Sequence, residues 1–496
     1  MMTVFSILPQ TRQFLGRDLQ MFINGGWTPA VEGRSMSFHD PATGEPLGKV
    51  PAGTRADIDR AVRNAAQTFE NSAWSRLKPR DRQNLLWRLA DLVERDKQHL
   101  AELETLNNGK LLSVSLGDIQ FAIDYLRYMA GWATKIEGAS LNVSTELGLG
   151  EVFSGFTRRE PVGVVGAIVA WNVPFLLACW KLAPALATGC TIVLKPADET
   201  PLTALRLAEL VMEAGYPAGV FNVVTGTGAE VGAALASHPA VNKLTFTGST
   251  AVGKQVGKAA MDTLARVTLE LGGKSPVIVM PDADLDAAAI GAANAIFANQ
   301  GQVCCAGSRL YVHRKVFDRV VADVANIARS ITLGNGLDAR SQMGPLISLR
   351  QVNRVDSYID VGLSEGAEVV CGGKPSGPGY FYEPTVMVNV GQDHRVVREE
   401  IFGPVLTALP FDDLEQVLAM ANDTAYGLGA SIWTSSLATA HRAIPKIKSG
   451  SVWVNCHTIL DASLPFGGYK GSGLGREMGS AVIEHYTELK SVLIQV

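Results

Sequence analysis

The chain has 496 residues, of which 47% are hydrophobic and 19% are charged, and its formal net charge at pH 7 is -4. This length exceeds what one hydrophobic core usually supports, so we expect a globular protein of two or more domains. The basic residues are scattered and the balance is slightly acidic, which excludes an electrostatic attraction to nucleic acid or to an acidic membrane surface.

The six cysteines are too sparse for a disulfide framework. They stand at positions 179, 190, 304, 305, 371 and 456, with no Cys-x-x-Cys pair and no neighbouring histidine at zinc spacing. We therefore predict reduced thiols, no metal site and a cytoplasmic location.

Helical and strand patterns follow one another along the first half of the chain. From about residue 55 to residue 140 the pattern is helical, as at 57–69 and 81–95, with charges on one face. From residue 161 onward short apolar strands alternate with helices, and the predicted strands are 163–169, 191–195, 220–224, 243–246 and 267–271. Such alternation predicts right-handed crossovers and a parallel sheet with helices on both faces.

Residues 161–180 carry no charge, and this stretch has the length of a membrane-spanning helix. It contains Pro161, Asn172 and Pro174, and its first half is β-branched. We therefore favour a buried strand followed by a turn and a helix, with a membrane span as the alternative, and we predict no membrane partner.

A second α/β series begins near Ser275 and runs to about residue 465. Its predicted helices lie at 285–298, 315–331 and 414–420. Residues 151–159 are predicted as one arm of a hairpin and residues 490–496 as an edge strand. Because exposed apolar edges need a partner, we expect subunits to pair through both segments.

Cys304 is the candidate nucleophile. It follows the run Asn-Gln-Gly-Gln-Val at residues 299–303, which is poor core material, and a preceding apolar helix offers a rigid mount. A buried structural thiol is the alternative for Cys304 alone, and the neighbouring Cys305 is predicted to pack. A free thiol with a pKa of about 8.5 is only about 3% thiolate at pH 7, so a base or a positive environment must assist it.

Two polar residues upstream complete a set of groups for chemistry at a carbonyl carbon. Glu270 ends an apolar strand, where it is either a solvated carboxylate or a base that accepts the thiol proton or activates water. Asn172 is either a turn residue or an amide donor to an oxyanion, an effect worth about 3–4 kcal/mol.

Two glycine-rich stretches suggest phosphate binding. Residues 225–232 follow a predicted strand but miss the dinucleotide spacing by one residue. Residues 248–254 satisfy most of a P-loop, but Gln255 replaces the magnesium-binding hydroxyl, which disfavours an ATPase or a kinase. A helix N-terminus that offers Gly248 and Ser249 to a cofactor pyrophosphate stays open.

Together these segments resemble the aldehyde dehydrogenase superfamily over essentially the whole chain. The matching motifs are Trp171-Asn-Val-Pro, Lys195-Pro-Ala-Asp, Phe246-Thr-Gly-Ser-Thr, Leu269-Glu-Leu-Gly-Gly, Gly301-Gln-Val-Cys, Glu400-Ile-Phe-Gly-Pro and Pro465-Phe-Gly-Gly-Tyr-Lys-Gly-Ser-Gly. The resemblance implies an α/β fold with a Rossmann-like parallel-sheet cofactor domain, an α/β catalytic domain and a small β oligomerisation arm. It places the cofactor domain at 1–140 and 161–271, the catalytic domain at 272–465, the arm at 141–160 and 484–496, and a return segment to the cofactor domain at 466–483.

The resemblance also implies roles for single residues. Cys304 would be the nucleophile, and Glu270 would be the general base. Asn172 and the Cys304 N–H would form the oxyanion hole. Glu477 would relay protons towards Glu270. The implied cofactor residues are Trp171, Lys195, Asp198, Gly228, Gly248, Ser249, Val252, Glu400 and Phe402. Relatives often carry Glu at position 198, where it binds both ribose hydroxyls. Asp198 is also acidic, so we expect NAD, and because Asp198 is shorter than Glu, NADP is the alternative.

By analogy with the family, eight apolar positions should line the substrate tunnel. They are Val173, Leu177, Trp180, Phe297, Ala298, Val303, Leu460 and Phe466. Many relatives carry phenylalanine at positions 173 and 298, so the smaller residues leave room for an aromatic side chain, and the lack of arginine disfavours semialdehydes. The loop at 455–465 also resembles that of bacterial phenylacetaldehyde dehydrogenases.

The resemblance therefore implies oxidation of an aromatic aldehyde, phenylacetaldehyde, to its acid through a cysteine thiohemiacetal and thioester. Another medium-sized apolar aldehyde is the first alternative. An alternative of a different class is a thiol hydrolase that pairs Cys304 with His457 and uses no nucleotide, and a catalytically idle relative is a third. The family analogy implies a homotetramer or homodimer joined through the 141–160 hairpin and the C-terminal strand.

Overall fold

The computed structural model describes residues 6–144 and 152–496. Its largest element is an eight-stranded sheet with the order β19-β11-β10-β7-β8-β9-β1-β2. Five neighbouring strands run parallel, as predicted: β11 (Arg266–Glu270), β10 (Lys243–Thr247), β7 (Val164–Ile168), β8 (Thr191–Lys195) and β9 (Phe221–Val223). Antiparallel strands that the sequence pattern did not predict form the edges: β19 (Gly473–Leu474), β1 (Met21–Ile23) and β2 (Gly26–Thr28).

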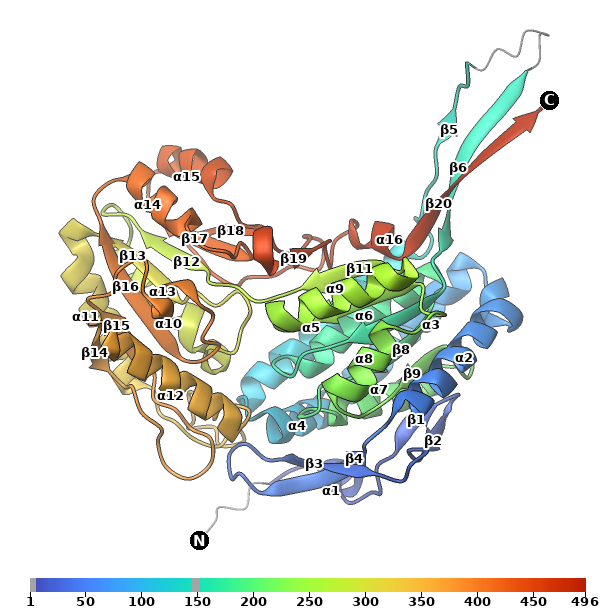
Figure 1. The fold of residues 1–496 in the computed structure, drawn as a ribbon, viewed down its shortest axis with the longest axis horizontal. Helices are drawn as coiled ribbons and strands as arrows, with labels where there is room; N and C mark the ends of the chain where they lie inside the picture. The colour runs from blue at the N-terminus through green and yellow to red at the C-terminus, as the bar shows by residue number, and fades with distance from the viewer. Residues whose placement is uncertain (1–5, 145–151) are drawn as a thin grey trace.

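Helices cover both faces of this sheet. Successive side chains of a strand point to opposite faces, so each strand contributes to two separate cores. Val165 and Ala167 of β7 pack in one core, and Val164 and Ile168 pack in the other. The first core contains residues of α1 (Pro9–Leu15), α3 (Pro79–Arg95), α4 (Lys97–Asn108), α5 (Leu112–Trp132), α6 (Pro174–Thr188) and α7 (Leu202–Glu213). The second contains residues of α2 (Arg55–Asn71), α8 (Ala233–Ala236) and α9 (Thr250–Thr263). The predicted α/β class with a layered parallel sheet is confirmed (Figure 1).

Local sequence explains where several of these helices begin and end. The helix predicted at 57–69 begins earlier, at Arg55, because Thr54 and Asp57 form a capping box in which Thr54 N–H donates to Asp57 Oδ2 at 2.9 Å. Helix α4 ends at Gly109, whose φ of 90° lies in the left-handed region that glycine adopts without strain. These two caps set the start of α2 and the end of α4, whose apolar residues pack on opposite faces of the sheet.

The uncharged stretch at 161–180 forms a strand, a turn and a helix, as we favoured. Strand β7 is buried in the centre of the sheet, and α6 begins at Pro174. Within residues 6–144 and 152–496, no helix is long and apolar enough to cross a membrane.

The second α/β series forms a seven-stranded sheet with the order β14-β15-β16-β13-β12-β17-β18. Its strands are β14 (Glu368–Cys371), β15 (Thr385–Val388), β16 (Val405–Phe411), β13 (Arg309–His313), β12 (Pro276–Val279), β17 (Gly429–Trp433) and β18 (Ser451–Val454), and only the edge strand β14 is antiparallel to its neighbour. Helices α10 (Leu285–Phe297) and α11 (Phe317–Ser330) pack on one face. Helices α12 (Leu349–Ser364), α13 (Arg395–Arg398), α14 (Leu414–Asn422) and α15 (Leu437–Ala443) pack on the other.

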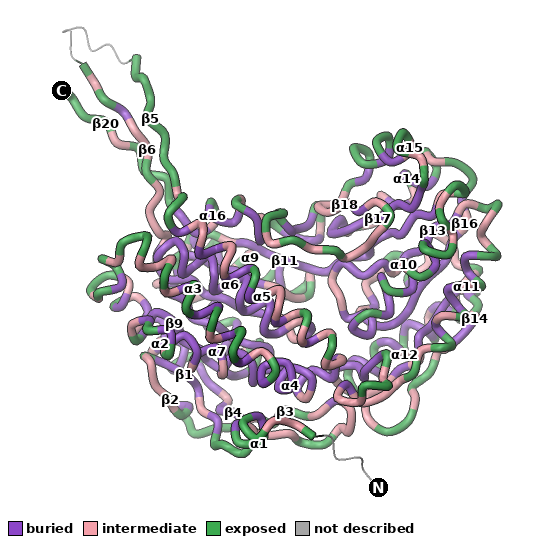
Figure 2. The backbone as a smooth tube through the Cα atoms, turned by 180° about the vertical axis from the view of Figure 1, so that it is seen from behind, coloured by how far each residue is buried: buried purple, intermediate pink, exposed green. Residues whose placement is uncertain are grey.

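A separate three-stranded antiparallel sheet projects from the body of the molecule, with the C-terminus near its tip (Figure 1). It consists of β20 (Thr487–Gln495), β6 (Phe153–Pro161) and β5 (Ser140–Leu141), and α16 (Val482–His485) precedes β20. The predicted hairpin arm and C-terminal strand are therefore paired, although residues 145–151 of the predicted hairpin lie outside the described residues. Most of this sheet is exposed (Figure 2), while a small hairpin of β3 (Ser35–His39) and β4 (Pro46–Pro51) lies near the N-terminus.

Candidate active site

The carboxyl ends of the parallel strands in the first sheet carry most of the predicted cofactor residues. Trp171 follows β7, Asp198 follows β8 and Gly228 follows β9, while Gly248 follows β10 directly. In open α/β sheets, ligands bind in the crevice outside these strand ends. Residues from four separate segments therefore meet at the edge where a dinucleotide is expected.

Lys195 and Asp198 form an ion pair through Lys195 Nζ and Asp198 Oδ1. The second carboxylate oxygen of Asp198 accepts a hydrogen bond from Gly228 N–H at 3.4 Å. A cavity of about 240 Å³ borders Asp198 and Thr227. The Asp198 carboxylate of this pair thus lies beside open space, where it can contact the hydroxyls of a ribose.

The start of α9 offers backbone N–H groups to an anion. Ser249 is the N-cap residue, and its hydroxyl oxygen accepts a hydrogen bond from Val252 N–H at 3.4 Å. At Gly248, a Cβ atom would lie 2.5 Å from the Phe246 ring, so this close turn excludes a larger residue. A helix N-terminus of this kind suits a pyrophosphate.

Glu400 and Phe402 flank the chain where it crosses between the two sheets. Glu400 Oε1 accepts a hydrogen bond from Gly273 N–H at 3.0 Å, and burial raises the pKa of Glu400 to about 7. A Cβ atom at Gly272 would lie 2.2 Å from Glu400 Oε2. The Phe402 ring meets the Trp171 ring edge-on at 5.2 Å between centroids. Together with the α9 N-terminus and the Lys195 pair, these residues fit a dinucleotide that lies across the strand ends.

Cys304 lies against the same crossing. At Gly273, a Cβ atom would lie 2.3 Å from the Cys304 carbonyl oxygen, so the thiol-bearing turn packs directly on the end of β11. The pKa of the Cys304 thiol is raised well above its ordinary value by the contact with Cys305, by burial and by the nearby Glu270 carboxylate. The resting thiol is therefore protonated, and a base must take its proton.

Asn172 is tied to the turn that carries Cys304. Asn172 is buried, and its Nδ2 donates to the Gln302 carbonyl oxygen at 2.9 Å. A carboxamide has two N–H groups, so one anchors Asn172 and the other is left for a further acceptor. This arrangement suits a donor to an oxyanion beside Cys304.

Glu270 is almost fully buried at the end of β11, at 4% exposure. Neither of its carboxylate oxygens has a hydrogen-bond partner among the residues that the structure describes. Burial raises the pKa of Glu270 well above its ordinary value, and the Glu477 carboxylate raises it further. A raised pKa moves the titration of the Glu270 carboxyl group upward from the ordinary range of a glutamate, which suits a group that accepts and returns a proton.

Glu477 lies behind Glu270 in a buried polar cluster. Its Oε1 forms an ion pair with Lys181 Nζ of α6 and accepts a hydrogen bond from Thr245 Oγ1 at 3.1 Å. Its Oε2 has no partner within the described part of the chain. Glu477 therefore combines one fixed oxygen with one oxygen that is available to a proton carrier.

Most of the predicted tunnel residues share one apolar cluster. Leu177, Trp180 and Phe466 are buried in it, and the partly buried residues packed against it include Val173, Val303, Cys304 and Leu460. The rings of Trp180 and Phe466 lie 5.7 Å apart, and Phe121 of α5, which we did not predict, meets Trp180 at 6.4 Å. Two predicted lining residues lie outside this apolar cluster. Phe297 packs in the core of the second sheet, and Ala298 is exposed at the end of α10.

His457 does not contact the Cys304 thiol. Its Nδ1 lies 2.8 Å from Ser431 Oγ, and its Nε2 lies 2.8 Å from the Cys305 carbonyl oxygen. Both ring nitrogens are therefore engaged, and burial lowers the pKa of His457 to about 4. This geometry argues against the cysteine–histidine hydrolase.

The sequence interpretation missed residues that support the site. Lys181 is the one charged residue in α6, which is otherwise almost entirely apolar, and this isolation was the available signal. Asn108 and Asn299, which hydrogen-bond to the backbone at 171–172, gave no such signal. No cluster of three or more potential metal ligands occurs in the parts of the chain with described structure, at 6–144 and 152–496.

Comparison with known proteins agrees with this geometry. Residues 27–492 match the model of the aldehyde dehydrogenase family. Phenylacetaldehyde dehydrogenase of Pseudomonas fluorescens is 51% identical over 479 residues, which cover 96% of this chain and 95% of that protein. The chain therefore belongs to the aldehyde dehydrogenase family.

Two solved structures are also similar over nearly their full length. The NAD+ complex of an aldehyde dehydrogenase from Bacillus cereus has a TM-score of 0.97 and 45% identity, with 100% of both chains covered. An indole-3-acetaldehyde dehydrogenase mutant of P. syringae, solved with NAD+ and IAA, has a TM-score of 0.94 and 44% identity, with 98% of both chains covered.

Proposed function

We propose that this aldehyde dehydrogenase oxidises an aromatic aldehyde, phenylacetaldehyde, to its carboxylic acid with NAD. The observation that carries the proposal is the meeting of Cys304, Asn172 and Glu270 at the carboxyl edge of the first sheet, next to one apolar cluster. A thiol, an amide donor and a carboxylate are the groups that acyl chemistry at a carbonyl requires.

The proposed reaction begins with the Cys304 thiol. Its sulfur bonds to the aldehyde carbon, its proton passes to Glu270, and the carbonyl oxygen becomes an oxyanion held by Asn172 and the Cys304 N–H. Bound NAD supplies the hydride acceptor. The thiohemiacetal that has lost its hydride is a thioester. Glu270 then gives the thiol proton to Glu477, and the ionised Glu270 deprotonates the water that attacks the thioester carbon. The carbon–sulfur bond breaks, Glu270 returns a proton to the sulfur, and the acid and the thiol are released.

Phenylacetaldehyde fits the apolar surroundings of Cys304. Trp180 and Phe466 provide aromatic surface, and Val173 replaces the larger ring that many relatives carry. Two relatives with this fold act, by their names, on phenylacetaldehyde and indole-3-acetaldehyde, which both carry an aromatic ring on the aldehyde side chain. Another medium-sized apolar aldehyde is the alternative substrate.

NAD is favoured over NADP by the charge at the predicted ribose site. The Asp198 carboxylate is paired with Lys195 at the edge of the cavity. A carboxylate in this place accepts hydrogen bonds from ribose hydroxyls and repels a 2′-phosphate. We therefore expect a higher kcat/KM with NAD than with NADP.

We further propose the assembly, the domain division and the location of the protein. The exposed edges of the β5, β6 and β20 sheet would pair subunits into a homotetramer or a homodimer. The cofactor domain would comprise 1–140 and 161–271, the catalytic domain 272–465, the oligomerisation arm 141–160 and 484–496, and the return segment 466–483. All six cysteines are free, which suits the reducing cytoplasm.

A substrate panel tests this function. NADH formation is followed by absorbance with phenylacetaldehyde, a short aliphatic aldehyde and a semialdehyde, for the wild type and for Cys304→Ala. We expect the highest kcat/KM with phenylacetaldehyde and no turnover by the variant. A higher kcat/KM with the aliphatic aldehyde or the semialdehyde contradicts the aromatic assignment.

A further inference from the structure

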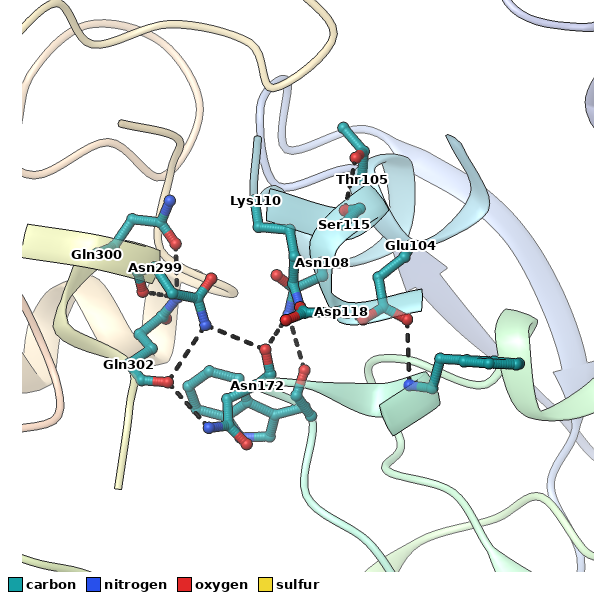
Figure 3. Close-up of polar contacts among 12 residues, drawn as sticks. Glu104, Thr105, Asn108, Lys110, Ser115, Asp118, Asn172, Asn299, Gln300 and Gln302 are labelled. Atoms are coloured by element: carbon teal, nitrogen blue, oxygen red, sulfur yellow. Dashed lines mark hydrogen bonds and ion pairs between the residues drawn. The ribbon is translucent and has the colours of Figure 1, made fainter. Parts of the chain in front are cut away.

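Side-chain amides hold the backbone of Asn172 from two sides (Figure 3). From the end of α4, Asn108 Nδ2 donates to the Trp171 carbonyl oxygen at 2.7 Å and lies 3.5 Å from that of Asn172. From the turn before Cys304, Asn299 Nδ2 donates to the Asn172 carbonyl oxygen at 3.1 Å and to that of Gln302 at 3.3 Å. The Asn172 peptide is thus clamped between two elements that are distant in the sequence.

The turn on the Cys304 side has little freedom. Asn299 and Gln300 have φ angles of 47° and 58°, in the left-handed region that residues other than glycine adopt at a cost of about 1–3 kcal/mol. Gln302 is fixed by a hydrogen bond from Ile347 N–H to its Oε1 at 3.0 Å. The hydrogen bonds of Asn299 therefore support a strained turn and join it to the backbone of Asn172.

The α4 side is anchored as firmly. Lys110 is fully buried, and its Nζ lies 3.0 Å from Glu104 Oε1 and 2.8 Å from Asp118 Oδ2. The other oxygen of Glu104 accepts a hydrogen bond from Phe175 N–H at 3.1 Å, in the first turn of α6. The end of α4 therefore contacts the 171–175 segment both through Asn108 and through Glu104.

We propose that Asn108 and Asn299 are positioning residues that aim the free N–H of Asn172 at the oxyanion, an inference that rests on the oxyanion role in the proposed function. The carboxamide of Asn172 is planar, so fixing its backbone and one N–H fixes the direction of the other. A donor fixed before the reaction stabilises the developing charge without reorganisation. Neither Asn108 nor Asn299 contacts the substrate in this assignment.

The orientation of Asn108 supplies a diagnostic substitution. The two atoms that face Asn108 Nδ2 are the carbonyl oxygens of Trp171 and Asn172. An amide oxygen cannot donate to them, so the NH₂ group of Asn108 must face them. Asn108→Ala removes the donor, whereas Asn108→Asp has nearly the same volume and sets a carboxylate oxygen against the two carbonyls. We expect Asn108→Asp to slow acylation at least as much as Asn108→Ala.

A double-mutant cycle on ester hydrolysis tests the proposal. With 4-nitrophenyl acetate, the Cys304 sulfur bonds to the acetyl carbon, the thiol proton passes to the base, and the bond to 4-nitrophenolate breaks. We expect Asn172→Ala to slow acylation by about 10²–10³-fold and Asn108→Ala to slow it by about 10-fold. In the Asn172→Ala background, Asn108→Ala should then change the rate by less than about twofold.

Thr105→Val is the matched control for a general loosening of α4. Thr105 Oγ1 lies 2.9 Å from Ser115 Oγ, buried in the same helix but away from Asn172. We expect this variant to lower the melting temperature about as much as Asn108→Ala and to change acylation by less than about twofold. Equal rate losses in the two variants would show that Asn108 has only a structural role.

Three results would each overturn the inference. The first is an equal slowing of acylation by Asn108→Ala in the wild-type and Asn172→Ala backgrounds, and the second is an unchanged acylation rate in Asn172→Ala. The third is an equal loss of acylation rate in Asn108→Ala and Thr105→Val. The ester assay needs neither NAD nor hydride transfer, which separates the inference from the proposed function. If Asn108→Ala and Asn172→Ala are coupled in ester hydrolysis but the enzyme does not oxidise the aldehyde, the proposed function is refuted and the inference stands. If the enzyme oxidises the aldehyde but the effects of the two substitutions are additive, the inference is refuted and the proposed function stands.

Discussion

The two sides of Cys304 differ in how completely their polar groups are paired. On the Asn172 side, Asn172 Nδ2 and the carbonyl oxygens at 171, 172 and 302 have hydrogen-bond partners, while Asn108 Oδ1 has none among the described residues. On the Glu270 side, both oxygens of Glu270 and one oxygen of Glu477 have no partner among the described residues. Both sides are buried, so exposure to water does not explain the difference.

The difference corresponds to the two kinds of work that the site would perform. A donor to a developing oxyanion is effective when its direction is fixed in advance. A group that accepts and returns a proton must instead exist in both charge states, and a permanent strong partner would favour one of them. Substitutions of Cys304, Glu270 and Lys181 test this contrast.

Replacement of the nucleophile should have the largest effect. Cys304→Ala removes the only atom that would carry the acyl group, and we expect aldehyde oxidation to fall by at least about 10³-fold. The measurement is kcat for NADH formation, with the melting temperature as a check of folding. Turnover near the wild-type level in Cys304→Ala would show that the acyl group is not carried by this residue.

Glu270→Gln should abolish the pH dependence of thioester hydrolysis. Water activation needs the ionised carboxylate, so the rate should rise with pH, and because burial raises the pKa of Glu270 this rise should lie above the ordinary range of a glutamate. We expect Glu270→Gln to lower the deacylation rate by about 10²–10⁴-fold and to remove the rise.

The deacylation step is measured on acyl-enzyme formed from 4-nitrophenyl acetate, in which Cys304 no longer carries a proton. Asp461→Asn, an exposed carboxylate in the 455–465 loop, is the control and should keep the wild-type profile. A pH-dependent rise that persists in Glu270→Gln would assign water activation to another group.

The ion pair behind Glu270 should affect stability. Lys181→Met leaves the Glu477 carboxylate buried without its cation, which should lower the free energy of unfolding by about 3–5 kcal/mol. The double variant Lys181→Met/Glu477→Gln removes both charges and should recover much of that loss. Denaturant unfolding measures both, and an equally unstable double variant would show that lost packing, not an unpaired charge, causes the effect.

The smallest expected effect among these substitutions is a change in substrate preference in Val173→Phe. A ring added to the apolar cluster competes with the aromatic side chain of the substrate, and we expect kcat/KM for phenylacetaldehyde to fall by about 10-fold relative to propanal. Ile290→Phe adds the same ring on the exposed face of α10 and should leave the ratio unchanged. An unchanged ratio in Val173→Phe would mean that position 173 does not select the substrate.

The regular parts of the fold were predictable because their patterns are strong. Strands such as β7 and β8 are buried on both faces and form continuous apolar runs, so the parallel sheet could be inferred from local sequence. The edge strands β1, β2 and β19 have two or three residues each, too few for a periodic pattern. Their positions depend on the sheet that they join.

The same distinction applies to the candidate site. Cys304, Glu270 and Asn172 stand within short motifs, and the family resemblance carried by those motifs selected them as candidate site residues. Asn108 and Asn299 both contact Asn172, although they lie 64 and 127 positions away from it in the sequence. No local pattern contains contacts of this range, and only the fold brings them together.

The most direct test of the account is to locate the acyl group. The Glu270→Gln variant, in which the Cys304 proton must pass to water, is incubated with phenylacetaldehyde and NAD until NADH formation levels off. The protein is then quenched in acid and digested, and the peptides are analysed by mass spectrometry. We predict a phenylacetyl group on the peptide that contains Cys304, and none when NAD is omitted. Acylation of a different residue, or a Cys304 peptide that stays unmodified while NADH forms, would contradict the account.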